Sequence, residues 1–212
     1  MTAGKRATIF VVDDDPSMQK GLQRLLKSAH YAVETFSSAK DFLAFDNSGN
    51  GPTCLILDLQ MPGMNGLDLQ AELMSQNRTI PIIFVTGHGD IPSSVKAIKT
   101  GAVDFLSKPF DDENLFDAIE EALLKAAKAR TVLEEKEGIR QRLDTLTPRE
   151  YEVLTHVIAG LLNKKTAYIL NISEKTVKVH RARIMEKMGV GSVAQLVRLA
   201  EKVGVQPVEV SI

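Results

Sequence analysis

Short apolar runs alternate with segments of helical spacing through the first 125 residues. The apolar runs cover 8–13, 32–36, 53–58, 81–86 and 103–107. The segments of helical spacing cover 16–28, 38–45, 66–77, 91–100 and 112–127. Strict alternation of strands and helices is typical of a parallel sheet with helices on both faces. The pattern therefore predicts an α/β domain in which all strand carboxyl ends lie at one edge of the sheet, because crossovers between parallel strands are right-handed.

The pattern changes after residue 125. Residues 126–146 are rich in charge and in good helix formers, so we predict a linker that is at least partly helical. Ala122, Ala126, Ala129 and Leu133 recur at heptad-like spacing, which is compatible with a coiled-coil seam but too short to specify one. Gly138 is expected to weaken the helix.

From residue 147 onward the pattern is helical. Helices are predicted at about 147–160, 163–170, 173–188 and 192–203. Thr147, Pro148 and Glu150 form the signature of a capped helix start. Asn171 and Ile172 make a tight turn between the second and third of these helices, which favours a helix-turn-helix.

Composition narrows the class of protein. Hydrophobic residues make up 44% and charged residues 25% of the chain, as in soluble globular proteins. No apolar run approaches the ~20 residues that span a bilayer, and the single cysteine, Cys54, excludes a disulfide framework within the chain. We therefore expect a cytoplasmic protein without a membrane partner.

The charge is distributed unevenly. Residues 1–125 hold 11 Lys and Arg against 17 Asp and Glu, whereas residues 126–212 hold 15 against 10. An acidic half joined to a basic half suggests a metal or phosphoryl site in the first and a polyanion partner for the second. Chance segregation of surface charge would give the same counts, so the charge distribution alone does not identify a function.

Acidic residues follow two of the predicted strands. Asp58 ends the run that begins at residue 53, and Asp13 and Asp14 follow the first strand. Carboxylates packed together at a sheet edge repel one another, and a divalent cation relieves that repulsion. Oxygen ligands of this kind favour Mg²⁺. Asp58 would then act as the nucleophile that forms an acyl phosphate.

Two further residues are predicted at the same edge. Lys108 follows the fifth strand and offers an ammonium to the Asp58 carboxylate or to a phosphoryl oxygen. Thr86 ends the fourth strand and offers a hydroxyl. Each residue alone is ordinary at a strand end, but four such strand ends together indicate phosphoryl chemistry.

The third helix of the second half has two distinct faces. Val177, His180, Ile184 and Met188 recur at helical spacing and are expected to face the core. The opposite face is basic with small apolar residues among the charges, and it comprises Lys175, Lys178, Val179, Ala182 and Arg183. Such a face suits a DNA major groove, although a solvated helix face has a similar composition. Lys164, Lys165 and Lys187 are candidates for phosphate contacts.

The first half resembles the receiver domain of two-component response regulators, which has a flavodoxin-like, five-stranded, doubly wound parallel sheet. The matching segments are 11–16, 57–66, 86–89 and 101–110. The resemblance implies that Asp58 accepts a phosphoryl group from a histidine kinase and that Mg²⁺ is held by Asp13, Asp14, Asp58 and the backbone carbonyl of Gln60. It further implies that Thr86 and Lys108 bind the acyl phosphate, that the Lys108–Pro109 peptide is cis, and that Phe105 occupies the position of a switch aromatic.

The second half resembles the four-helix LuxR-type DNA-binding domain, and the whole chain is similar to the FixJ/NarL class, nearest the FixJ branch. The matching segments are 146–150, 162–167 and 172–181. The resemblance implies base contacts by Lys178, Val179 and Arg183 and a phosphate contact by Thr176. Thr166 departs from the usual aliphatic residue and is expected to loosen the core slightly.

These inferences define one functional hypothesis. Residues 1–125 are expected to form the receiver, 126–146 the linker and 147–212 the DNA-binding domain of a phosphorylation-dependent transcriptional regulator. The resemblance implies a homodimer on promoter DNA. It favours an activator over a repressor, with RNA polymerase as a candidate partner. Two alternatives stay open here. An aspartyl-phosphate phosphatase would need an acid where Gln60 stands, and a signalling adaptor would accept phosphate without binding DNA.

Overall fold

The computed structural model describes residues 7–46, 51–87, 95 and 97–209. The chain divides into two compact units, residues 1–130 and 131–212, and each is described by itself. Among the described residues, no helix is long and apolar enough to cross a membrane.

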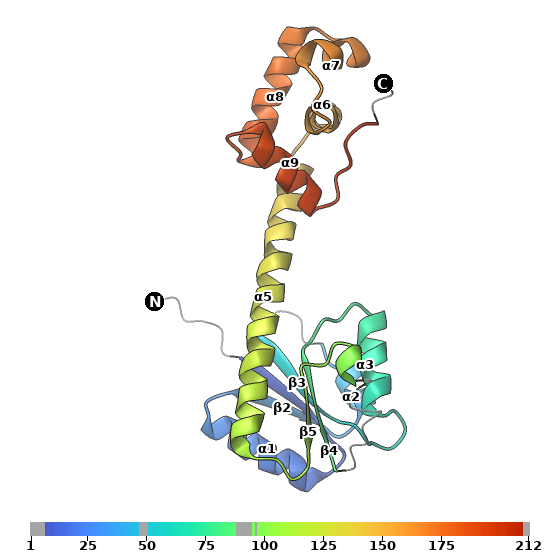
Figure 1. Cartoon of the computed structure of the whole chain (residues 1–212), viewed down its shortest axis with the longest axis vertical. Coiled ribbons are helices and arrows are strands. Elements are labelled where there is room, and N and C mark those ends of the chain that lie inside the picture. Colours follow the sequence, from blue (N-terminus) through green and yellow to red (C-terminus); the bar gives the residue numbers. More distant parts are fainter. Residues whose placement is uncertain (1–6, 47–50, 88–94, 96, 210–212) are drawn as a thin grey trace. The chain divides into compact units, whose positions relative to one another are not determined.

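A five-stranded parallel sheet forms the centre of the first unit, in the order β2-β1-β3-β4-β5 (Figure 1). The strands are β1 (Thr8–Val12), β2 (Ala32–Phe36), β3 (Thr53–Asp58), β4 (Ile82–Thr86) and β5 (Asp104–Ser107). All four strand pairs are parallel. The predicted strands are therefore confirmed, with ends that differ by at most one residue.

Helices cover both faces of this sheet (Figure 1). Helices α1 (Pro16–Ser28) and α5 (Asp112–Asp144) pack on one face, and α2 (Ala39–Ala44) and α3 (Gly66–Ser75) pack on the other. The strands are buried on both sides because their residues alternate between the two cores. Phe10 and Leu55 face α2 and α3, while Ile9 and Ile56 face α1 and α5. Half of the helix predicted at 91–100 lies outside the described residues, and residues 95 and 97–99 are helical.

Helix α5 contributes residues to both units. It runs without interruption from Asp112 to Asp144, through Gly138. Leu115, Ile119 and Ala122 are buried in the first unit, whereas Leu133 is 61% exposed. Ile139 is buried again, this time in the core of the second unit.

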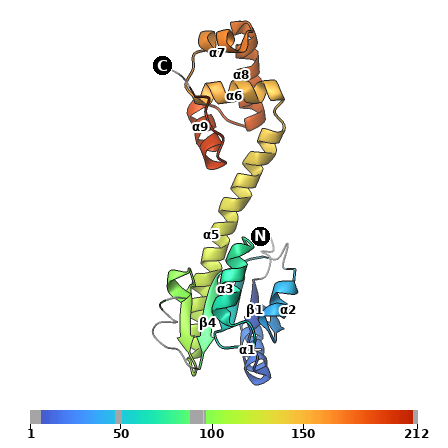
Figure 2. The same ribbon diagram turned by 90° about the vertical axis from the view of Figure 1, so that its right-hand side faces the viewer.

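The second unit contains α6 (Pro148–Ile158), α7 (Asn163–Leu170), α8 (Glu174–Met188) and α9 (Val193–Lys202) (Figure 2). Their apolar faces enclose one core. The predicted capping box is confirmed, because Thr147 and Glu150 each bond the other's backbone N–H. Asn171 adopts the left-handed conformation, with φ of 50°, that the tight turn between α7 and α8 requires.

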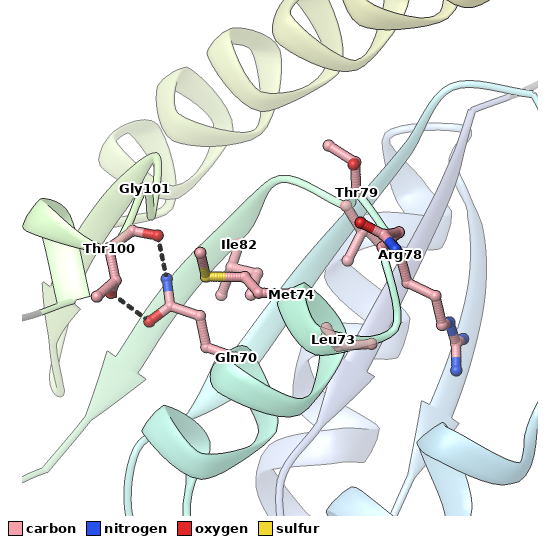
Figure 3. Close-up of a pocket in the computed structure, with 10 residues that line it drawn as sticks. Gln70, Leu73, Met74, Arg78, Thr79, Ile82, Thr100 and Gly101 are labelled. Atoms are coloured by element: carbon pink, nitrogen blue, oxygen red, sulfur yellow. Dashed lines mark hydrogen bonds between the residues drawn. The ribbon is translucent and has the colours of Figure 1, made fainter.

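A cavity of about 330 Å³ lies beside the end of α3 and the start of β4 (Figure 3). Gln70 spans one side of it, accepting a hydrogen bond from Thr100 Oγ1 at 2.7 Å and donating one to the Thr100 carbonyl at 3.3 Å. The cavity adjoins the amino end of β4, whereas the predicted phosphoryl site lies at the carboxyl ends of the strands. It is therefore separate from that chemistry.

Gly66 allows α3 to begin directly against the end of β3. A β-carbon at this position would lie 2.5 Å from the Asp58 carbonyl oxygen and 2.9 Å from the Phe84 ring. We predict that Gly66→Ala lowers the free energy of unfolding by about 1–3 kcal/mol, because the backbone that carries Asp58 must move. Chemical denaturation of the full chain measures this change.

The matched control is Gly21→Ala within α1, where a β-carbon would meet no atom within 4 Å. This substitution should instead stabilise the protein by up to ~1 kcal/mol, because alanine is the better helix former. Equal effects of the two substitutions would contradict the close approach at Gly66.

Candidate phosphoryl-transfer site and nucleic-acid interface

The carboxyl ends of β1 and β3 bring three acids together. Asp13 and Asp14 follow β1, and Asp58 is the last residue of β3. One carboxylate oxygen from each lies within 4.8 Å of the others. Asp13 and Asp58 are buried, while Asp14 is exposed. The cluster predicted from the strand ends is therefore present, with one side open to solvent.

Local hydrogen bonds fix the acidic residues. The Asp13 backbone N–H donates to the Phe36 carbonyl at 3.2 Å, and the Asp13 side chain accepts from the Asp15 N–H at 2.8 Å. Gln19 Nε2 donates to the Asp13 carbonyl at 2.6 Å. These bonds hold Asp13 at the end of its strand without using its second carboxylate oxygen, Oδ2.

Lys108 reaches this cluster from the end of β5. Its Nζ lies 2.8 Å from Asp13 Oδ2 and 3.5 Å from Asp58 Oδ1. Its backbone N–H donates to the Thr86 carbonyl at 2.7 Å. The Lys108–Pro109 peptide is cis, as the resemblance implied. One ammonium therefore bridges two carboxylates that lie 45 residues apart in the sequence.

Burial and charge shift the acidity of both partners. Burial raises the pKa of Asp58, the neighbouring charge of Asp13 raises it further, and Lys108 only partly offsets these effects. Burial by itself would lower the pKa of Lys108, but hydrogen bonding and charge from Asp13, together with Asp58, outweigh it and leave that pKa raised. Lys108 therefore stays protonated, while the Asp58 carboxylate is held at a free-energy cost.

The residues present fit a hard divalent cation. Three carboxylates against one ammonium leave excess negative charge at the cluster, and its donor atoms are all oxygens. Mg²⁺ prefers such ligands and retains several waters, which suits a site that is open on the Asp14 side. A bound Mg²⁺ would supply charge neutralisation for an incoming phosphoryl group.

The remaining receiver residues surround the cluster. Thr86 is fully buried at the end of β4, and Gln60 is exposed two residues after Asp58. Phe105 on β5 is partly buried, with its ring centre 6.3 Å from that of Phe84. Phe105 therefore packs in the core on the α2 and α3 face of the sheet.

Helix α8 separates its two faces as predicted. Val177, Ile184 and Met188 are buried. Exposed side chains occupy the opposite face: Lys175, Lys178, Val179, Ala182 and Arg183. His180 is half-buried, and its Nδ1 has no hydrogen-bond partner within the described part of the chain. Lys164 and Lys165 are exposed on α7, the helix that precedes α8.

Two candidate DNA contacts also have partners inside the protein. The Thr176 hydroxyl lies 2.8 Å from that of Ser173. Lys187 Nζ lies 2.6 Å from Glu150 Oε2 and donates to the Thr145 carbonyl at 2.8 Å. The bonds from Lys187 and from the Thr147 N–H lower the pKa of Glu150. Sequence reasoning assigned Glu150 only to the capping box, and no local signal links it to a lysine 37 residues away.

Asp58→Asn should raise the stability of the full chain at pH 7.5 in the absence of divalent cations. The raised pKa means that ionised Asp58 opposes folding. This penalty is absent below the unfolded-state pKa and complete above the folded-state pKa. The gap between wild type and variant should therefore close as the pH falls through the Asp58 pKa. Thermal unfolding at a series of pH values measures it.

Added Mg²⁺ provides the complementary test of the cluster. It should stabilise wild type, by about 1.4 kcal/mol at tenfold excess over its dissociation constant. It should stabilise Asp58→Asn less, because one ligand oxygen has lost its charge. An equal response of both proteins to Mg²⁺ would contradict the cation site.

Glu150→Gln should destabilise the second unit by about 1–3 kcal/mol at pH 7, because the bond from the Lys187 ammonium loses its charged acceptor. A lowered carboxyl pKa contributes stability above its unfolded-state value and loses it as the pH falls through the folded-state value. The difference should therefore vanish in acid. Glu152→Gln breaks an exposed pair with Arg149 and should cost less than about 1 kcal/mol.

Comparison with known families covers both units. Residues 9–120 match the family described as response regulator receiver domain, and residues 144–200 match bacterial regulatory proteins of the luxR family. The first match argues against the phosphatase alternative, because it places residues 9–120 in the response regulator receiver family. The second answers the adaptor alternative by adding a DNA-binding domain.

Curated relatives resemble the chain over nearly its whole length. Nodulation protein W of Bradyrhizobium diazoefficiens is 44% identical over 96% of this chain and 89% of that protein. Response regulator protein TodT of Pseudomonas putida is 47% identical over 93% and 87%. Transcriptional regulatory protein FixJ of Rhizobium meliloti is 44% identical over 94% and 98%.

Solved structures agree with these relatives. Response regulator StyR matches with a TM-score of 0.81 and 48% identity, over 93% of this chain and 99% of that one. Full-length FixJ from B. japonicum matches with a TM-score of 0.56 and 41% identity, over 96% and 98%. The chain therefore belongs to the two-component response regulators that join a receiver domain to a LuxR-type DNA-binding domain.

Proposed function

We propose that phosphoryl transfer from a histidine kinase to Asp58 switches the binding of this regulator to promoter DNA. The observation that carries the proposal is the position of Lys108 Nζ, within 3.5 Å of the carboxylates of both Asp13 and Asp58. A nucleophilic carboxylate, a fixed cation and two further acids form a site suited to a phosphoryl group with its metal ion.

The transfer step balances without any other reactant. An Asp58 carboxylate oxygen forms a bond to the donor phosphorus while the phosphorus–nitrogen bond of the kinase phosphohistidine breaks. The electron pair of that bond stays with the imidazole nitrogen, which then takes a proton from solvent water. Lys108 offsets negative charge on the phosphoryl oxygens. Asp13, Asp14, Asp58 and the Gln60 carbonyl would hold Mg²⁺ beside them.

The switch would act through Thr86 and Phe105. Phosphorylation adds about −1.5 to −2 charges with strong acceptor oxygens. The Thr86 hydroxyl can donate to one of these oxygens, and the Phe105 ring can fill the space that Thr86 leaves. Phe105 has no hydroxyl, so its part in the switch would be by packing alone.

The basic face of α8 would read the DNA. Lys178, Val179 and Arg183 would meet base edges, and Lys164, Lys165 and Thr176 would meet phosphates. Lys187 would approach DNA only on the outer side of the ion pair with Glu150, so we assign it a smaller share of the phosphate contacts. Two copies would bind two half-sites, which raises the effective concentration of each DNA-binding unit.

The proposal also assigns a role to each part of the chain, a cellular location and an effect on transcription. Residues 1–125 would act as the receiver, 126–146 as the linker and 147–212 as the DNA-binding domain. A cytoplasmic location gives access to a kinase and to DNA. Activation of transcription, with RNA polymerase as the further partner, is the favoured outcome of binding.

The test is DNA affinity with and without phosphorylation. Wild type with Mg²⁺ and acetyl phosphate should bind a duplex selected from a random pool at least ~10-fold more tightly than without the donor, because two half-sites are then held by one dimer. Fluorescence anisotropy measures the affinity, and Asp58→Asn should show no response to the donor. A phosphorylated wild type with unchanged affinity would refute the switch and leave the fold intact.

The recognition face has its own test. Arg183→Ala should weaken binding to the selected duplex by about 1–3 kcal/mol if Arg183 contacts a base. Lys165→Ala should weaken binding to all duplexes alike. It should also lower the slope of the logarithm of affinity against the logarithm of salt concentration by about one. Loss of the same size on selected and shuffled duplexes for Arg183→Ala would contradict base reading.

A further inference from the structure

The last turns of α5 pack into the core of the second unit. Ile139 is fully buried and shares a core with Ile184 and Met188 of α8. Leu143, one turn further along α5, packs against the same core. The part of α5 that the sequence predicts as linker therefore contacts the carboxyl-terminal half of α8 directly.

A side chain from α5 completes the end of α8. The last carbonyls of any helix lack partners within the helix. Here the Gly189 N–H donates to the Glu186 carbonyl and the Val190 N–H donates to the Met185 carbonyl, in a Schellman-type ending. The Met188 carbonyl takes no part in that ending. Arg142 Nη1 of α5 donates to it at 2.7 Å.

Arg142 is itself fixed on α5. Its Nε donates to the Gly138 carbonyl, one turn earlier, at 3.1 Å. A β-carbon at Gly189 would lie 3.4 Å from Arg142 Nη1, so the guanidinium lies close against the turn that follows α8. One planar cation thus links a carbonyl of α5 to the last carbonyl of α8, where the helix dipole favours positive charge.

A second cation joins the same two regions. Lys187, in the last turn of α8, donates to the carbonyl of Thr145, the residue after α5, and to the Glu150 carboxylate. The carboxyl end of α8 is therefore held from two directions, by Arg142 reaching out from α5 and by Lys187 reaching back.

We propose that Arg142 is a positioning residue for the recognition helix, through which the end of α5 sets the tilt of α8 for sequence-specific DNA binding. The inference rests on the proposed function, in which the exposed face of α8 reads bases. A helix of fifteen residues is about 22 Å long, so a small displacement at its anchored end changes the angle at which its other residues meet the groove. Phosphate contacts tolerate such a change better than base contacts, which require fixed geometry.

The experiment compares three full-length variants with wild type. Arg142→Met removes the donors but keeps a long side chain. Arg142→Lys keeps the charge and one possible donor to the Met188 carbonyl. Arg140→Met is the matched control, because Arg140 is exposed on the same helix and has no bonded partner among the residues described. Each is phosphorylated with Mg²⁺ and acetyl phosphate and titrated against a selected duplex and a shuffled duplex, well below its unfolding temperature.

Arg142→Met should bind the selected duplex about tenfold more weakly than Arg140→Met, which corresponds to the loss of one charged hydrogen bond. Both variants should bind the shuffled duplex equally, since both lose one charge. Arg142→Lys should recover part of the specific affinity. Hydrogen exchange of the Gly189 and Val190 amides should accelerate in Arg142→Met and stay at the wild-type rate in Arg140→Met.

Two results would overturn the inference. One is equal specific affinity of Arg142→Met and Arg140→Met. The other is a loss for Arg142→Met that is the same on both duplexes, which indicates a fold defect alone. If Arg142→Met unfolds below the assay temperature, Arg142→Lys is compared with wild type, since both carry the same charge, and it should lose part of the specific affinity because an ammonium cannot reproduce both guanidinium bonds. Arg183→Ala distinguishes failure of the Arg142 inference from failure of the proposed function. If Arg183→Ala keeps wild-type specificity for the selected duplex, base reading by α8 is itself refuted.

Discussion

Repulsion between carboxylates at one edge of the sheet is the constraint on which the receiver depends. The ends of β1 and β3 hold one carboxylate oxygen of each of Asp13, Asp14 and Asp58 within 4.8 Å of the others, and the Lys108 ammonium offsets part of their charge. Burial, together with the neighbouring charge of Asp13, raises the pKa of Asp58, and the remaining excess of negative charge favours binding of a cation. Such a site suits a metal ion and a phosphoryl group together, because the charge of each would offset that of the other.

The second unit uses charge differently. Its core is apolar, but the ends of its helices are fixed by cations that each reach a carbonyl or a buried carboxylate, namely Arg142 and Lys187. Removing one partner of such a contact leaves a polar group without its bond, which costs more than the contact contributes in net terms. The carboxyl end of α8 is therefore fixed by a few polar contacts as well as by the apolar core.

Sequence patterns predicted what depends on local periodicity. The strands, the capping box at Thr147 and the tight turn at Asn171 follow from short segments, and the structure confirms them. The strand ends also predicted the acidic cluster, because parallel topology brings distant termini together. Thr166, expected to loosen the core, is buried with a hydroxyl that has no hydrogen-bond partner among the described residues, which gives that expectation a physical basis.

Features that depend on distant partners could not be predicted in this way. The Glu150–Lys187 pair joins residues from different helices, and neither residue has a local pattern that identifies the other. The unbroken course of α5 was also not foreseen, because Gly138 lowers helix propensity. The helix continues through it because Ile139 is buried in the core of the second unit and Arg142 bonds the Gly138 carbonyl. Tertiary contacts there outweigh a propensity cost of about 1 kcal/mol.

The account requires above all that Asp58 accept a phosphoryl group in a reaction that depends on the cation site. Mass spectrometry of wild type after incubation with acetyl phosphate, with and without Mg²⁺, tests this most directly. We expect a mass gain of one phosphoryl group that appears only with Mg²⁺, maps to Asp58 and is removed by hydroxylamine, as an acyl phosphate should be. A stable adduct on another residue, or no adduct on Asp58 with Mg²⁺ and donor present, would contradict it.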